Sequence, residues 1–95
     1  MTVILTKTGT GTVSSDGTTG KVIYDSTGTG MLPVQAKVTG TASFRVMARV
    51  DPAAPWFEVI APGSIDFLQS IAWVPYVQLE IVSGAGTVDL WVGEK

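Results

Sequence analysis

The 95-residue sequence contains no histidine and no cysteine. Without histidine, a serine nucleophile lacks its usual acid–base partner. Without cysteine, disulfides and thiolate metal sites are excluded. Asparagine is also missing, so the chain offers no acceptor for N-glycosylation. We therefore expect a protein that is not an enzyme and that uses neither a metal nor an organic cofactor.

Charge is also scarce in this chain. Only 15% of its residues are charged and 45% are hydrophobic, whereas soluble domains carry about 25% charged residues. The net charge is −2 and the six basic residues form no stripe, so we expect no binding to nucleic acid. No segment resembles a signal peptide or a membrane span, so we expect synthesis in the cytoplasm and no membrane contact. The surplus of apolar side chains predicts that part of the surface is covered by other proteins.

Composition changes near residue 30, although the length allows only one domain. We interpret residues 1–30, which are rich in glycine and threonine, as an N-terminal arm with edge strands, and residues 31–95 as a β-sandwich core. The first part has few large side chains, so we expect contact with a partner to order it. Deletion of residues 1–20 should then leave the sandwich folded. Short strands are expected in this part at Val3–Thr6, Gly11–Ser14 and Val22–Tyr24, with a turn at Asp16-Gly17.

The second part of the chain has the pattern of successive β-strands. Between residues 42 and 50, apolar residues alternate with Arg45, Met47 and Arg49, the period of a half-buried strand. No segment shows a sustained helical period. We therefore predict an all-β protein, an antiparallel β-sandwich or jelly-roll-like single domain. The further strands are expected at Trp56–Ala61, Ile65–Phe67, Ser70–Trp73, Tyr76–Val82 and Thr87–Val92.

Two of the short connections predict β-hairpins with one apolar face each. A two-residue turn at Gly84-Ala85 would place Leu79 opposite Leu90. A three-residue loop at residues 39–41 would place Ala36 opposite Phe44. In both cases the alternation of apolar residues selects the register, because a slip of one residue would turn every side chain to the other face.

The register of the last hairpin also places Glu80 opposite Asp89 on the outward face. Two carboxylates at such a position repel each other unless something neutralises them. One interpretation is a cation site or a glycosidase-like carboxylate pair. The other is an acidic patch that is neutralised by Arg45 or Arg49, in the same molecule or in a neighbour.

The aromatic side chains at strand positions allow two interpretations. Trp56, Trp73, Tyr76 and Trp91 could form a sugar-stacking platform, or they could belong to the core or to a subunit interface. Trp91 shares the outward face of Asp89, which favours contact with another chain. The candidate interface residues are Val3, Leu5, Arg45, Met47, Arg49, Trp56, Trp73, Tyr76, Glu80, Asp89 and Trp91.

Two regions of the chain resemble a known family of proteins. They are Thr41–Trp56, with its alternating strand followed by Ala54-Pro55-Trp56, and Ile71–Val92, with Trp73-Val74-Pro75-Tyr76 and a glycine turn. In this pattern the chain resembles the small β-sandwich virion proteins of tailed bacteriophages. The resemblance covers somewhat over half of the chain. The glycine- and threonine-rich front has no counterpart in it.

The resemblance implies a structural role in the virion. Proteins of this type decorate or cement capsids, often as trimers, or occupy tail and connector positions. It therefore implies a capsid decoration (cement) protein whose partners are the major capsid protein or other virion proteins, and which is itself a homo-oligomer, with a trimer favoured. A tail or head–tail joining protein is the alternative in the same class, and a carbohydrate-binding module is the alternative outside it.

Overall fold

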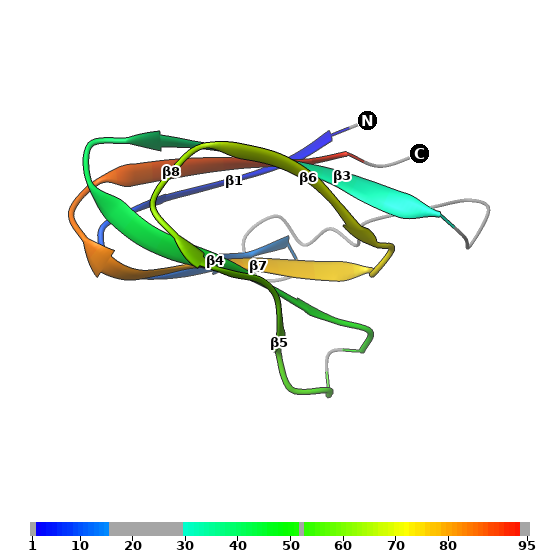
Figure 1. Cartoon of the computed structure of the whole chain (residues 1–95). Helices are drawn as coiled ribbons and strands as arrows, with labels where there is room; N and C mark the ends of the chain where they lie inside the picture. The colour runs from blue at the N-terminus through cyan, green and yellow to red at the C-terminus, as the bar shows by residue number, and fades with distance from the viewer. Residues whose placement is uncertain (1, 16–29, 52, 94–95) are drawn as a thin grey trace.

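The protein is an all-β sandwich of two four-stranded antiparallel sheets. The computed structural model describes residues 2–15, 30–51 and 53–93 (Figure 1). Sheet A has the strand order β1-β8-β3-β6 and sheet B the order β2-β7-β4-β5. This order is that of a jelly roll, as predicted. The strands are β1 (Thr2–Thr8), β2 (Gly11–Ser14), β3 (Met31–Thr39), β4 (Ala42–Arg49), β5 (Phe57–Gly63), β6 (Phe67–Ala72), β7 (Tyr76–Gly84) and β8 (Thr87–Gly93).

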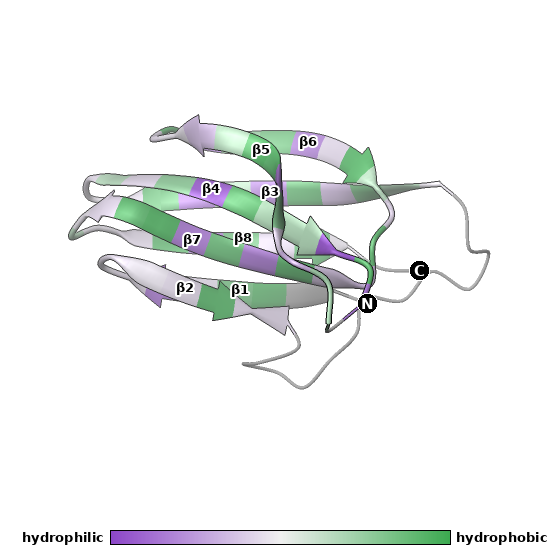
Figure 2. Cartoon of the chain, turned by 90° about the horizontal axis from the view of Figure 1, so that it is seen from below, coloured by the Kyte–Doolittle hydropathy of each residue, from purple (hydrophilic) through white to green (hydrophobic). Residues whose placement is uncertain are grey.

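Four short connections join strands that lie at matching positions in the two sheets. Strands β1 and β2, β3 and β4, β5 and β6, and β7 and β8 occupy matching positions in the two sheets (Figures 1 and 2). The two predicted hairpins are therefore wrong, because β3 is not paired with β4 and β7 is not paired with β8. Each connection is an arch instead of a hairpin. Both edges of β8 are already paired, with β1 on one side and β3 on the other.

The alternating pattern nevertheless identified the buried faces correctly. The inward side chains of β7 (Val77, Leu79, Ile81) and of β8 (Val88, Leu90, Val92) are fully buried. Figure 2 shows apolar and polar residues alternating along β4 and β7. Within sheet A, Leu90 lies between Leu5 of β1 and Ala36 of β3. A period of two determines which side chains share a face, but two apolar faces can meet across a sandwich as well as within a hairpin.

Close backbone contacts join three of the arches. The amide N–H of Gly86 donates to the carbonyl oxygen of Thr41 at 2.8 Å, and the amide N–H of Gly9 donates to the carbonyl oxygen of Gly86 at 3.0 Å. A Cβ atom at Gly86 would lie 2.7 Å from the carbonyl oxygen of Thr39. The connection between β7 and β8 thus needs glycine here because another arch occupies the space of a side chain.

The front of the chain belongs to the sandwich. Strands β1 and β2 are the outermost strands of sheets A and B, and Leu5 is fully buried in the core. The hydroxyl of Ser15, also buried, accepts a hydrogen bond from the amide of Val77 at 3.2 Å. Deletion of residues 1–20 would remove both strands and a core side chain, so the expectation that the fold survives this deletion is not supported. The predicted strand Val22–Tyr24 and turn Asp16-Gly17 lie outside the described residues.

Truncation of Leu90 should destabilise the protein strongly. Leu90 is fully buried between its two neighbours in sheet A, so Leu90→Ala should lower the free energy of unfolding by about 2–5 kcal/mol. The control is Leu68→Ala, since Leu68 is 70% exposed on the same sheet and its truncation should change stability by less than about 0.5 kcal/mol. Urea unfolding followed by circular dichroism measures both. Equal losses would contradict the assignment of the core.

The packing of the arches predicts that alanine at position 86 lowers the stability of the protein. Gly86→Ala places a methyl group against Thr39 and Thr41 and should cost about 1–3 kcal/mol, as overpacking does. Gly63→Ala is the matched control, because nothing lies within 4 Å of a Cβ atom there. Thermal unfolding compares the two variants. If both melt like the original protein, the arches do not pack as described.

Candidate functional site

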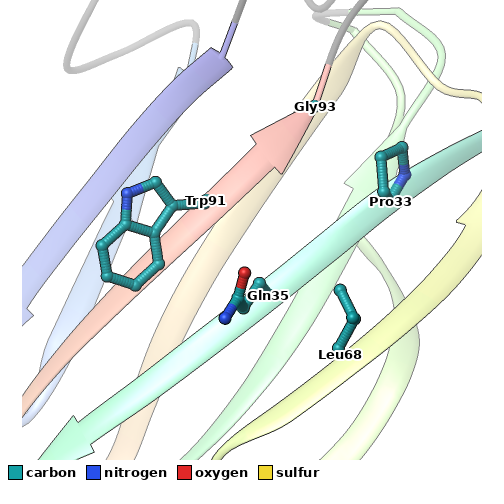
Figure 3. Close-up of a pocket in the computed structure, with 5 residues that line it drawn as sticks. All are labelled: Pro33, Gln35, Leu68, Trp91 and Gly93. Carbon is teal, nitrogen blue, oxygen red and sulfur yellow. The ribbon is translucent and has the colours of Figure 1, made fainter.

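The outer face of sheet A carries a shallow depression around Trp91. In the register of the sheet, Trp91 lies between Ile4 of β1 and Gln35 of β3, and Gln35 lies beside Leu68 of β6. The depression has a volume of about 380 Å³ and is lined by Pro33, Gln35, Leu68, Trp91 and Gly93. Figure 3, which looks onto this sheet, shows the indole ring of Trp91 face-on, with the Gln35 amide between it and Leu68.

A row of charged and hydroxyl side chains follows the Trp91 row on the same face. Asp89 lies beside Lys37 in the register, and the Thr6 hydroxyl donates to a carboxylate oxygen of Asp89 at 2.8 Å. Directly before β6, the carboxylate of Asp66 accepts a hydrogen bond from the backbone amide of Val38 at 2.8 Å. This row therefore contains one cation, Lys37, and two carboxylates, and the hydrogen bond from Thr6 fixes the position of Asp89.

The outer face of sheet B is organised around Arg45. Its guanidinium donates to the carboxylates of Glu80 and Glu58, the latter at 3.2 Å. The hydrogen bond to Glu80, followed by that to Glu58, raises the pKa of Arg45. The predicted neutralisation of Glu80 by Arg45 is confirmed. The predicted pairing of Glu80 with Asp89 is wrong, because the two residues lie in different sheets and Glu80 lies beside Arg45 and Thr12.

A second depression lies where β4 ends and β5 begins, at the opposite end of the sandwich from the arches. It has a volume of about 260 Å³ and is almost wholly apolar. Val50 and Phe57 on its rim are 71% and 74% exposed. Figure 1 shows the β4–β5 connection and the start of β5 extending beyond sheet B. The lining residues are Ala48, Arg49, Val50, Ala54, Pro55, Phe57, Val59 and Val74.

An arginine–aromatic cluster borders this second depression. The guanidinium carbon of Arg49 lies 4.1 Å from the ring centre of Trp56 and 5.8 Å from that of Tyr76. Arg49 and Tyr76 are neighbours in the register of β4 and β7, whereas Trp56 belongs to the connection before β5. The stacking therefore holds this connection against the sheet.

The predicted interface residues do not form one surface. Trp91 and Asp89 lie on the outer face of sheet A, and Arg45, Glu80, Arg49, Trp56 and Tyr76 lie on the side of sheet B. Trp73 is partly buried against the core, so the four aromatic residues do not share a sugar platform. Leu5 and Met47 are buried and cannot present an exposed contact. The side chain of Val3 lies outside the described part of the structure.

Several exposed residues escaped the sequence analysis. Val50 and Phe57 flank the Asp51–Pro55 break in the strand pattern, and this break was the available signal for a projecting connection. Gln35 takes an outward position between the buried Val34 and Ala36. Within residues 2–15, 30–51 and 53–93, no three potential ligands come together to hold a metal ion. No helix in those ranges is long and apolar enough to cross a membrane.

The chain was compared with protein families, curated proteins and solved structures. The chain matches no protein-family model, no curated protein and no solved structure.

Removal of the Arg49 guanidinium should loosen the β4–β5 connection. Its contact with Trp56 joins the connection to sheet B, and such contacts contribute about 0.5–1 kcal/mol at exposed sites. In Arg49→Ala we expect faster hydrogen exchange at the backbone amides of Ala53, Ala54, Trp56 and Phe57, with unchanged exchange in β8. Lys37→Ala, on the other sheet, is the control and should leave all of these amides unchanged. Equal protection of these amides in both variants would show that the cation–π contact does not restrain the connection.

Proposed function

We propose that this protein is a non-enzymatic structural protein of a bacteriophage virion, most simply a capsid decoration (cement) protein. It would act by binding the major capsid protein or other virion proteins. The observation that carries the proposal is the exposed apolar surface formed by Val50, Phe57 and Val59, here called the β5 patch, around the second depression.

The β5 patch has the features of a protein interface. Exposed apolar surface beside polar residues is typical of protein interaction sites. The neighbouring cluster of Arg49, Trp56 and Tyr76 consists of the residue types that dominate binding energy in interfaces. Burial of a side chain such as Phe57 contributes about 1.5–3 kcal/mol. A partner that fills the depression and covers Phe57 would therefore gain affinity from few contacts.

The same surface supports self-association. A projecting connection can dock on a different surface of the next copy, and such a heterologous contact closes into a ring when the rotation fits. A homotrimer is the state that the resemblance to phage virion proteins favours. The rigid sandwich would then present three copies of its outer faces to the shell. A tail or head–tail joining protein would use the same surface with a different partner.

Substitution at the β5 patch should weaken association. In Val50→Ser/Phe57→Ser, we expect the native mass to fall to that of a monomer and cosedimentation with phage heads to be lost, because the apolar contact is removed. Val82→Ser is the control, since Val82 is 42% exposed on β7, away from the patch. Circular dichroism should show that all variants remain folded. Light scattering after gel filtration gives the native mass.

A different result for the unsubstituted protein would contradict the proposal. If this protein is monomeric at high concentration and cosediments with no phage particle, it is not a decoration protein. A carbohydrate-binding module is the second candidate function, and the depression around Trp91 favours it.

A further inference from the structure

We propose that the depression around Trp91 on the outer face of sheet A binds a neutral oligosaccharide. This site is separate from the β5 patch, which lies on the side of sheet B. The inference therefore does not depend on the proposed virion role, and a decoration protein or a soluble binding module could carry such a site equally well.

The shape of the site fits a chain of sugar rings. Ile4, Trp91, Gln35 and Leu68 form one row across all four strands of the sheet. With neighbouring strands about 4.8 Å apart, the row is roughly 14 Å long, enough for about two or three sugar rings. The indole of Trp91 lies face-on to solvent in the view onto the sheet (Figure 3). The apolar C–H face of a pyranose can stack on such a ring.

One wall of the depression is held in place by backbone packing. A Cβ atom at Gly93 would lie 2.6 Å from Cγ of Pro33, so the proline ring occupies the space that a side chain would take. Pro33 also belongs to a central strand, where its neighbours restrict movement. The site is therefore formed before a ligand arrives, and binding would cost little ordering of the protein.

The polar groups of the site indicate an uncharged ligand with many hydroxyls. The Gln35 amide, next to the indole, can donate and accept hydrogen bonds at once. Beyond it, Asp89 is fixed by Thr6 and lies beside Lys37, and Asp66 adds a second carboxylate to this row. An anionic ligand would be repelled by this additional carboxylate. Hydroxyl groups, by contrast, can donate to the carboxylate and accept from the ammonium group.

The position of Gln35 argues for a sugar in preference to a protein partner. Protein interfaces usually have an apolar centre and a polar rim. Here the order is reversed, because the Gln35 amide lies between Trp91 and the exposed Leu68. A protein that covered this row would bury the amide near the centre of the contact, whereas a sugar would offer it hydroxyl partners.

Nuclear magnetic resonance of the full-length protein can test the proposal with defined probes. The probes are cellohexaose, xylohexaose, maltohexaose, laminarihexaose and chitohexaose, each titrated separately. We expect at least one of them to shift the indole N–H of Trp91 and the side-chain amide of Gln35, while the indole N–H of Trp56 stays in place. A roughly tenfold rise in ionic strength should leave the affinity unchanged, because the probes carry no net charge.

Matched variants separate this site from other surfaces. Trp91→Ala and Gln35→Ala should each weaken binding at least about tenfold, a change of about 1.4 kcal/mol, while Trp56→Ala should bind as the original protein does. Gln35→Ala keeps the test valid if Trp91→Ala fails to fold. The proposal is overturned if no probe shifts the Trp91 and Gln35 signals, if Trp56→Ala weakens binding equally, or if these signals shift only with protein concentration. The last outcome would assign the surface to protein contact.

Discussion

The packing of the arches at one end of the sandwich is the constraint on which the rest of the structure depends. Gly86 donates to Thr41 and accepts from Gly9, so one residue links three connections. Because each arch takes the chain from one sheet to the other, these contacts keep the two sheets in register with each other. The inward rows of β7 and β8 can then meet at the centre, and every outward row has a defined neighbour. Both candidate sites consist of such outward residues.

The sequence predicted the class of fold and the faces of its strands. Alternation along residues 42–50, 76–82 and 87–92 identified residues that are buried, because side chains two apart lie on the same side of a strand. It did not predict which strands are paired. A short glycine connection suits a hairpin and an arch alike, and the choice depends on partners far away in the chain, such as β1 beside β8. The strand propensity of a segment does not indicate which distant strand will pair with it.

The same limit explains the outcome for the candidate sites. The alternation of apolar and polar residues along each strand predicts that Trp91 and Arg45 point outward. The ion pair of Arg45 with Glu80 depends on their opposite charges and on the pairing of β4 with β7. The proximity of Gln35 to Trp91 depends on the pairing of β3 with β8, which no local pattern contains. From the sequence, Leu5 is expected at an interface, because it lies in the part of the chain that contact with a partner is expected to order. Its burial depends on β8, more than 80 residues away.

The pairing of β1 with β8 has a consequence for synthesis of the chain. In sheet A, β8 lies between β1 and β3, and Thr2 is the neighbour of Gly93. While the chain is being made, β1 and β3 therefore have a gap between them that only β8 can fill. Sheet A cannot close until β8 has been added. A chain that stops before Thr87 lacks β8, the strand that carries Trp91 and lies between β1 and β3. Such a truncated chain cannot form the outer face of sheet A.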